Sequence, residues 1–297
     1  MDWDDLRIFL QVTRTKQLTH AAKELGVDDS TVGRRVARLE KQLGVRLLQR
    51  AGRRTVITEQ GEKLATAIEE LESIVLRKIA GLGENELLVA GKIRIGAPEG
   101  LGVGYLSRVL AELSAKNQQL ETELVALPRT YSLASREVDI AVTLERPTTG
   151  QVVAQKLTDY HLSLYGSAVY FKSHRRPKAA SDLKHHILTG YIPELQFTKE
   201  LVAVNLGGAS RANPRIRSTS VIAQVNAVAS GAAIGMLPGY LARSHKELRP
   251  ILDQDLRITR SYWISVHDDL RHLQRVQTVL KAITARVRQD RGLFLQR

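Results

Sequence analysis

The chain has 297 residues, which exceeds one average domain of about 100–200 residues and predicts two or three cores. Hydrophobic residues make up 43% and charged residues 25% of the chain, so collagen-like and largely disordered proteins are excluded. The absence of cysteine excludes disulfides, thiolate zinc sites and iron–sulfur clusters. An excess of 44 Lys and Arg over 31 Asp and Glu gives a net charge of +13, which favours a polyanionic partner such as nucleic acid.

The charge and the apolar residues are distributed unevenly. Residues 1–58 carry a net charge of +5, residues 59–90 carry −4 and residues 91–297 carry +12. No window of the sequence approaches the roughly 18 apolar residues that a membrane span needs, and the amino end is acidic where a signal peptide would be basic. We therefore expect a cytoplasmic protein that has no membrane partner.

The first fifty residues predict three short helices joined by tight turns. A first helix is expected over about residues 4–14. A second is expected to begin with Thr19 as its N-cap and to end at Gly26, and Asp28 is expected to cap the third. The third helix has apolar residues at spacings of four, three and four on the side that should be buried: Val32, Val36, Leu39 and Leu43. A helix, a glycine turn and a second helix in this order are typical of a helix–turn–helix.

The opposite side of the third helix carries residues suited to DNA recognition. Short polar side chains at the start of such a helix can reach base edges in the major groove, and arginines one turn later can hold phosphates. Arg38 is expected to face outward as well, and a basic β-hairpin wing is expected before Thr58. The predicted DNA-binding residues are Asp29, Ser30, Thr31, Arg34, Arg35, Arg50, Arg53 and Arg54. A solvated charged surface is the ordinary alternative, but the combination of helix–turn–helix, wing and long following helix favours DNA binding.

Residues 59–90 predict one long amphipathic helix. Thr58 is expected to cap it, with Glu59 and Glu62 near its positive end. Its apolar residues recur at spacings of three and four: Leu64, Ile68, Leu71, Val75, Ile79 and Leu82. We expect this apolar stripe to pair with the same helix of a second copy, and packing against its own chain is the alternative.

From Gly91 onward, short β-rich runs alternate with helical stretches. Strands are expected at residues 93–95, 123–126, 139–142, 163–165, 233–237 and 262–266, and helices at 101–116, 221–230 and 270–287. This alternation predicts a parallel sheet with helices on both faces. About two hundred such residues would form two lobes, and ligands would bind beyond the carboxyl ends of the strands.

Several of these segments together resemble LysR-type transcriptional regulators. The segments that carry the resemblance are AAKELGV at 21–27, VARLEKQLGVRLLQR at 36–50, TEQG at 58–61, DIAV at 139–142 and VASGAAIGMLP at 228–238. The resemblance covers the whole chain and implies an α/β multidomain protein. It implies an N-terminal all-α winged helix–turn–helix domain (1–58), a linker and dimerisation helix (59–90), and a two-lobed α/β effector-binding domain (91–297) similar to type 2 periplasmic binding proteins. Lobe I would contain residues 91–160 and 267–297, and lobe II residues 161–266.

The chain departs from the family pattern at two positions that bear on DNA. Where the family commonly has Ser-Gln-Pro or Ser-Gln-Ser at the start of the recognition helix, this chain has Asp28-Asp29-Ser30. Asp29 lacks the amide that reads adenine, but its carboxylate can accept a hydrogen bond from a cytosine amino group. The wing sequence Gly52-Arg53-Arg54 is richer in charge than usual, which should steepen the salt dependence of binding.

The resemblance also implies a small-molecule effector in the cleft between the lobes. The implied effector-binding residues are Ala97, Pro98, Glu99, Gly100, Arg129, Thr130, Thr143, Tyr191, Thr219 and Ser220. A helix that begins at residue 220 or 221 would direct free amides toward an anionic group, and Arg129 agrees with that. Glu99 favours a cationic or hydroxylated ligand instead. In the alternative interpretation, Thr219 and Ser220 only cap the helix.

No enzyme signature is complete. Residues 100–105 lack the final glycine of the dinucleotide fingerprint, Ser181 and Lys184 have no accompanying motif, and His185-His186 lacks the spacing of a zinc helix. We therefore predict no catalytic residue, cofactor or metal. The sequence predicts a sequence-specific transcription regulator that binds double-stranded DNA and a small-molecule effector and acts as a homotetramer, a dimer of linker-helix dimers. The alternative is a small-molecule binding protein whose basic head binds nucleic acid without sequence specificity.

Overall fold

The chain divides into two compact units in a computed structural model. The first unit contains residues 1–85, and the second contains residues 86–133 and 138–297. The structure describes residues 2–15, 17–51, 54–80, 89, 91–127, 133, 137–148, 151–195, 214–253 and 255–295, with only the backbone described at 50–51, 54–55, 69–70, 73–74 and 76–80. None of the helices in these ranges is long and apolar enough to cross a membrane.

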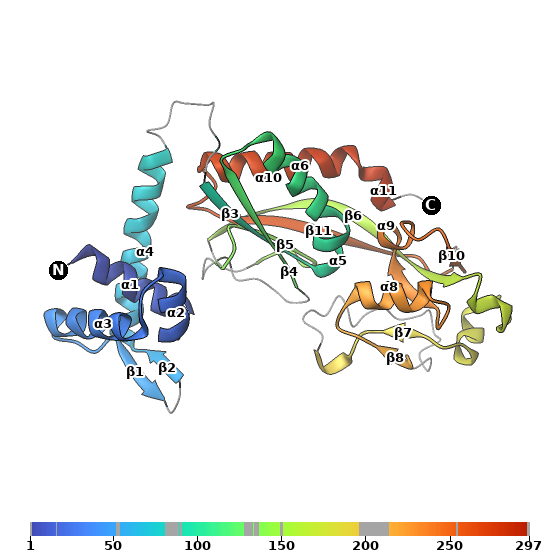
Figure 1. Ribbon diagram of the computed structural model, residues 1–297, viewed down its shortest axis with the longest axis horizontal. Helices are drawn as coiled ribbons and strands as arrows, with labels where there is room; N and C mark the ends of the chain where they lie inside the picture. The colour runs from blue at the N-terminus through green and yellow to red at the C-terminus, as the bar shows by residue number, and fades with distance from the viewer. Residues whose placement is uncertain are drawn as a thin grey trace. The chain divides into compact units, whose positions relative to one another are not determined.

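The first unit is a three-helix core followed by a hairpin and a long helix (Figure 1). In chain order it contains α1 (Trp3–Thr15), α2 (Leu18–Leu25), α3 (Asp29–Leu43), β1 (Leu48–Ala51), β2 (Arg54–Ile57) and α4 (Glu59–Ala80). Phe9 of α1 and Val32 and Leu39 of α3 are completely buried in a shared core. β1 and β2 pair antiparallel, so the wing is a β-hairpin as predicted. The three-helix part that precedes it is all-α, also as predicted.

Two details of these helices differ from the prediction. α2 begins at Leu18 with Gln17 at the N-cap, because the backbone of Gln17 is still extended at φ −146° and ψ 128°. Leu43 is exposed rather than buried, since Glu40 takes the buried position in the last turn of α3. The Glu40 carboxylate accepts hydrogen bonds from the backbone N–H groups of Leu47 (2.8 Å) and Leu48 (3.0 Å). Gly26 ends α2 in a left-handed conformation (φ +67°), which confirms the predicted turn.

α4 begins as predicted, and its apolar stripe is divided between two environments. The Thr58 hydroxyl accepts a hydrogen bond from the Gly61 N–H at 3.0 Å and so caps the helix. Ile68 is buried in the core of the first unit with Leu64 packed beside it, whereas Leu71 and Val75 are 45% and 46% exposed. The alternative that α4 packs on its own chain therefore holds for the first half of the stripe. The side chain of Ile79 and all of Leu82 lie outside the described residues.

The second unit is built on one curved mixed sheet. Its strands are β3 (Gly91–Ala97), β4 (Leu120–Ala126), β5 (Ile140–Thr143), β6 (Val152–Ser167), β9 (Gly235–Pro238), β10 (Leu248–Ile251) and β11 (Ile258–His267). The order is β10-β6-β11-β5-β3-β4, with β9 also paired to β6. β3 is parallel to β4 and β5, but β6, β9, β10 and β11 pair antiparallel, so the expectation of a parallel sheet was wrong for these strands.

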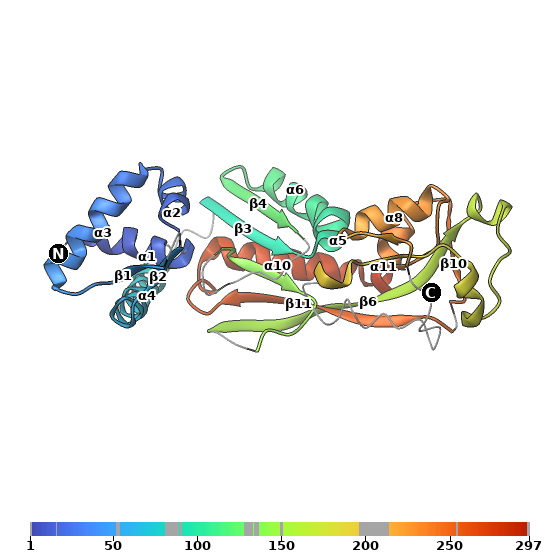
Figure 2. The same ribbon diagram turned by 90° about the horizontal axis from the view of Figure 1, so that it is seen from below.

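Two long strands, β6 and β11, connect the lobes and account for the antiparallel part of the sheet. β6 has 16 residues and β11 has 10, and they pair antiparallel along the length of the second unit (Figure 2). Long antiparallel neighbours need no crossover helix, unlike the parallel units that the alternation suggested. The lobe boundaries proposed from the sequence, 160/161 and 266/267, fall inside these two continuous strands.

The helices of the second unit lie on both faces of this sheet (Figure 1). They are α5 (Glu99–Leu101), α6 (Ser107–Lys116), α8 (Val221–Ala229), α9 (Gly239–Ala242), α10 (Gln274–Gln289) and α11 (Arg291–Leu295). A π-helical turn, Gly102–Leu106, joins α5 to α6, so the helix predicted over 101–116 is composite. A short parallel pair, β7 (Thr189–Gly190) and β8 (Ile216–Arg217), belongs to the second lobe with α8.

Candidate DNA-binding surface and effector cleft

The amino-terminal part of α3 presents an accessible polar surface. Asp29, Ser30 and Arg34 are exposed and Thr31 is half-buried, while Val32 of the same turn is completely buried. Among the residues that the structure describes, no carboxylate forms an ion pair with Arg34. This part of α3 can therefore offer short polar groups and one unpaired cation to a ligand, as the sequence predicts.

Arg35 has a different environment from the one predicted. Its guanidinium lies between α3 and α1, with Nη1 at 3.0 Å from Asp2 Oδ2 and 3.1 Å from Asp5 Oδ1. Arg38 joins the same cluster and donates to both Asp5 carboxylate oxygens, at 2.7 and 2.6 Å. These bonds hold α3 against the start of α1. The sequence alone predicts that both arginines face outward, but in the structure both bind carboxylates of the chain itself.

The Asp5 carboxylate is the centre of this cluster. Its residue is completely buried, and burial by itself would raise the pKa of the carboxyl group. Hydrogen bonds from Arg38 and Arg35 outweigh that effect and hold the pKa of Asp5 below its usual value. The sequence carries one signal for this cluster, because three aspartates occur within residues 2–5 at the start of α1.

The wing is described only as a backbone hairpin. Arg50 lies opposite Thr55, and Ala51 lies opposite Arg54. The side chains of Arg50 and Arg54, and all of Arg53, lie outside the described residues. The hairpin therefore has the form expected of a wing, and the DNA-binding role of its arginines stays a prediction.

In the second unit, the predicted effector residues converge on one small cavity. The cavity has a volume of about 40 Å³ and is lined by Pro98, Glu99, Gly100, Leu144, Tyr160, Leu162, Tyr191, Thr219, Val221, Pro238, Tyr240 and Tyr262. Five of these were predicted. Of the other predicted residues that the structure describes, Ala97, Thr143 and Ser220 do not line it: Ala97 is completely buried, and the Thr143 hydroxyl donates to the Glu145 carbonyl at 2.6 Å. Arg129 and Thr130 lie outside the described residues.

Glu99 connects α5 in the first lobe to the start of α8 in the second. Its Oε1 accepts a hydrogen bond from the Ser220 hydroxyl at 2.7 Å, and its Oε2 accepts one from the Val221 N–H at 3.0 Å. The Ser220 oxygen also accepts from the Ala223 N–H at 3.0 Å, which confirms the interpretation of Ser220 as a helix cap. The Val221 N–H, which was expected to be free for an anionic ligand, thus donates to a carboxylate of the chain itself.

Four tyrosines supply the aromatic side chains of the cavity lining. Tyr160 and Tyr262 stack with ring centroids 4.3 Å apart, and the Tyr240 and Tyr262 hydroxyls are 2.8 Å apart. Burial raises the pKa of all three phenols well above its usual value, so they stay neutral. Burial and the nearby Glu99 carboxylate raise the pKa of Tyr191 as well. Sequence reasoning missed Tyr160, Tyr240 and Tyr262 because they meet only when β6, α9 and β11 assemble.

The glycines at the start of this region are required by close packing. A Cβ atom on Gly100 would lie 2.8 Å from a methyl carbon of Val221, and one on Gly102 would lie 2.5 Å from the Cβ of Ala126. Such distances are shorter than real Cβ contacts allow. These glycines therefore serve close approach within a helical segment.

Comparisons with known proteins agree with this architecture. The family model described as the LysR substrate binding domain matches residues 88–288, and the model of the bacterial regulatory helix-turn-helix protein, lysR family, matches residues 3–62. The chain belongs to the LysR family of transcriptional regulators, with a DNA-binding helix–turn–helix unit and a substrate-binding unit.

Individual relatives have low sequence identity to this chain, but the similarity extends over most of its length. The chain is 28% identical over 251 residues to the iron-regulated virulence regulatory protein IrgB of Vibrio cholerae, covering 84% of each chain. Full-length AphB, a virulence activator of Vibrio cholerae, matches 96% of this chain and 99% of its own with a TM-score of 0.59 and 21% identity. A full-length OxyR variant from Pseudomonas aeruginosa matches 95% of this chain and 94% of its own, with a TM-score of 0.67 and 18% identity. The two solved structures support the fold alone.

Proposed function

We propose that this regulator reads a specific DNA sequence through the start of α3 and the β1–β2 wing. One observation carries the proposal: Ser30 and Arg34 are exposed on the same helix whose Val32 and Val36 are buried against α1 and α2. The helix is thereby fixed in orientation with its polar side available to the major groove. The residues assigned to DNA are Asp29, Ser30, Thr31, Arg34, Arg50, Arg53 and Arg54, and Arg35 positions α3 through Asp5.

A small-molecule effector is proposed to act in the cavity around Glu99. The carboxylate and the phenols of this cavity favour a ligand with hydrogen-bond donors or positive charge, because an anion would have to compete with Glu99 for the Val221 N–H. Binding would change the contact between α5 and α8 and hence the arrangement of the lobes. An effector shifts such an equilibrium only by its difference in affinity for the two arrangements.

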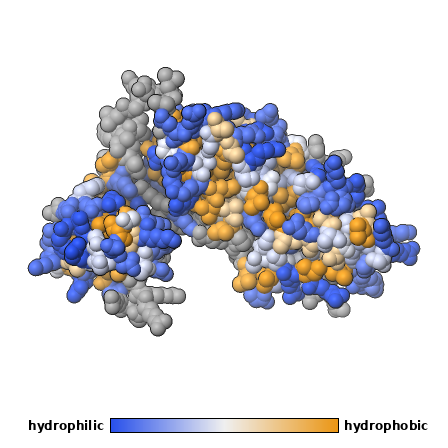
Figure 3. All heavy atoms as spheres, viewed as in Figure 1, coloured by the Kyte–Doolittle hydropathy of each residue, from blue (hydrophilic) through white to orange (hydrophobic). Residues whose placement is uncertain are grey.

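The assembly is proposed to be a homotetramer, located in the cytoplasm with its DNA. A tetramer built as a dimer of dimers requires two different interfaces. Leu71 and Val75 on α4 offer one exposed apolar surface. Val103 and Leu127 of the second unit are 50% and 44% exposed and are candidates for another. Figure 3 shows hydrophobic side chains gathered on the face of the second unit that it draws.

The experiment that tests DNA recognition is a pull-down of fragmented genomic DNA with the purified protein at near-physiological salt, followed by sequencing. We expect enrichment of a few sites with inverted repeats. Arg34→Gln should weaken binding to an enriched site and lower its salt slope by about 0.9, the value for one phosphate contact. Lys41→Gln, an exposed lysine at the other end of α3, is the matched control and should leave the slope unchanged.

The same experiment addresses the second candidate function. A small-molecule binding protein with a nonspecific basic head would recover genomic DNA uniformly, and Arg34→Gln would then weaken binding to all sequences alike. Uniform recovery together with an unchanged salt slope for Arg34→Gln would contradict the assignment of α3 as the recognition helix.

A further inference from the structure

A second and larger cavity lies on the opposite face of β6 from the effector cleft. Its volume is about 460 Å³, within the range of about 300–1,000 Å³ that is usual for small-molecule sites. Successive side chains of a β-strand point to opposite faces of a sheet. His161, Ser163 and Tyr165 of β6 line this cavity, whereas Tyr160 and Leu162 line the cleft. The two cavities are therefore separate, with β6 as the wall between them.

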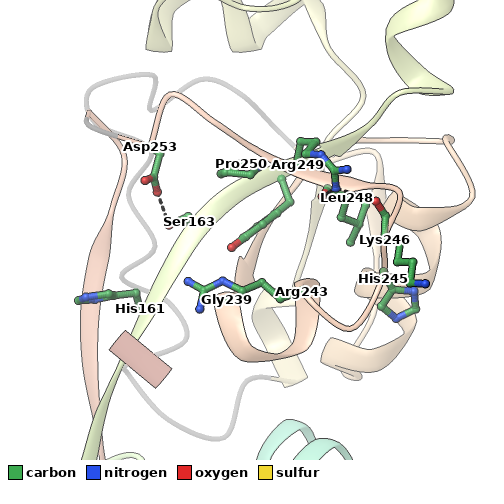
Figure 4. A pocket seen from close by; sticks show the side chains of 11 residues that line it. His161, Ser163, Gly239, Arg243, His245, Lys246, Leu248, Arg249, Pro250 and Asp253 are labelled. Atoms are coloured by element: carbon green, nitrogen blue, oxygen red, sulfur yellow. Dashed lines mark hydrogen bonds between the residues drawn. The ribbon is translucent and has the colours of Figure 1, made fainter. Parts of the chain in front are cut away.

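The permanent cations in the lining of this second cavity come from the end of α9 through the start of β10: Arg243, Lys246 and Arg249 (Figure 4). The whole lining consists of His161, Ser163, Tyr165, Gly239, Arg243, His245, Lys246, Leu248, Arg249, Pro250 and Asp253. Figure 4 shows the Arg243 side chain extending across the cavity toward His161. Three permanent cations therefore face a single carboxylate, that of Asp253.

The Asp253 carboxylate is already engaged by the protein. It accepts a hydrogen bond from the Ser163 hydroxyl at 2.8 Å, drawn as a dashed line in Figure 4, and it forms an ion pair with Arg257, which is not among the lining residues. It is therefore a poor counter-ion for the three lining cations. Glu247, which does not line the cavity, lies beside His245 at 3.5 Å.

Two of the cations have no carboxylate partner among the described residues. Arg249 donates from Nη1 to the carbonyl oxygens of Lys246 (2.6 Å) and Leu248 (2.8 Å), which fixes the guanidinium but leaves its charge uncompensated. Lys246 is exposed at the cavity mouth. Like charges gathered around a concave surface raise the local concentration of anions.

We propose that this cavity binds a small organic anion with two or more negative charges, such as a polycarboxylate or a phosphate ester. The site would lie outside the effector cleft and does not depend on the function proposed for that cleft. Lys246 and Arg249 would supply charge, and the Tyr165 hydroxyl on β6 would supply a hydrogen-bond donor, whereas the Ser163 hydroxyl already donates to Asp253. Arg243 and His161 also line the cavity.

The test is isothermal titration of the full-length protein at low salt with citrate and, separately, with pyrophosphate. We expect saturable binding of at least one of them at one site per chain, and the stronger of the two identifies carboxylate or phosphate as the preferred group. The double variant K246Q/R249Q should weaken binding about tenfold, since each exposed ion pair is worth up to about fivefold. The matched control K178Q/K184Q removes two exposed lysines of the same lobe and should leave the affinity unchanged.

A second readout locates the bound anion. The ring resonance of His161, assigned with His161→Gln, should shift on titration in the wild type and not in K246Q/R249Q. Thermal melting checks that each variant is folded. Absence of binding by both anions, equal weakening by both double variants, or shifts that spare His161 would overturn the proposal. A loss of DNA affinity in K246Q/R249Q with a lower salt slope would overturn it as well, because the cations would then contact DNA.

Discussion

At the scale of single residues, the start of α3 combines two opposing electrostatic effects. Asp28 and Asp29 are exposed at the positive end of the helix, where carboxylates stabilise the helix. The same carboxylates repel the phosphates that a recognition helix approaches. Asp28 makes no side-chain hydrogen bond as a cap, so it too is available to a ligand. We therefore expect the affinity for DNA to come from Arg34 and the wing, and Asp29 to contribute selectivity.

Asp29→Asn should raise the affinity for DNA and change the preferred base. Removing one negative charge near phosphate should strengthen binding about fivefold at low salt, with a smaller gain at higher salt because the interaction is screened. A cytosine preference at one position of each half-site should be lost, since an amide favours adenine. Binding to a randomised operator library measures both effects. Glu121→Gln makes the same change in total charge in the second unit, and an equal gain in that variant would refute the local explanation.

The Asp5 cluster predicts a dependence of stability on pH. The pKa of Asp5 in the folded protein lies below its ordinary value of 3.8, because hydrogen bonds from Arg38 and Arg35 favour the carboxylate despite its burial. Its contribution to the free energy of unfolding is therefore complete above the unfolded pKa and is lost as the pH falls through the folded pKa. Arg38→Gln should destabilise the first unit near neutral pH and reduce this loss in acid.

Urea unfolding of wild type and Arg38→Gln across the acidic range measures that difference. Arg7→Gln is the control, because among the described residues Arg7 has one ion pair, an exposed one with Asp4 one turn away at 2.8 Å. If both variants follow the same pH profile as the wild type, the buried carboxylate does not account for the coupling between α1 and α3.

At the scale of elements, the apolar stripe of α4 passes from buried to exposed within the part whose side chains are described. Ile68 packs into the first unit, whereas Leu71 and Val75 continue the same stripe and remain open to solvent. Leu71→Glu should reduce the assembly by one step, for example from tetramer to dimer, because it places a charge in an apolar contact between helices. Light scattering after size exclusion measures the mass. Ala67→Glu adds the same charge at an exposed position off the stripe, and an equal effect there would contradict a specific helix pair.

Elements set by local signals could be predicted from the sequence, and those set by distant contacts could not. α3 follows from Val32, Val36 and Leu39 with Gly26 before it, because helical periodicity and a left-handed turn are local properties. β6 was expected at three residues but has 16, since its first half (VVAQKLTD) has neither a continuous buried apolar run nor strict alternation, and it depends on pairing with β11. The family resemblance placed Glu99 and Ser220 in one cleft, but their direct hydrogen bond appears only in the fold.

At the scale of the whole molecule, β6 and β11 give the second unit a continuous frame that carries both lobes. The lobes also meet directly through Glu99 and the start of α8, over a sequence separation of more than 120 residues. Among the described residues, these hydrogen bonds converge on the Glu99 carboxylate, beside the close packing of Gly100 against Val221. This contact can therefore break without unfolding either lobe, which is the property that a ligand-controlled contact requires.

Glu99→Ala removes this contact and tests whether the cleft is coupled to DNA. The Ser220 hydroxyl and the Val221 N–H would lose their acceptor, so lobe arrangements without the contact would gain population. If that arrangement sets the spacing of the DNA-binding units in the assembly, operator affinity should change about fivefold or more, the lower end of common coupling strengths. The helix–turn–helix itself would be unaltered, so the salt slope should stay the same. Glu121→Ala is the matched exposed glutamate on β4, and Glu99→Gln keeps an acceptor while removing charge. Unchanged operator affinity and footprint in folded Glu99→Ala would show that the cleft contact and DNA binding are independent.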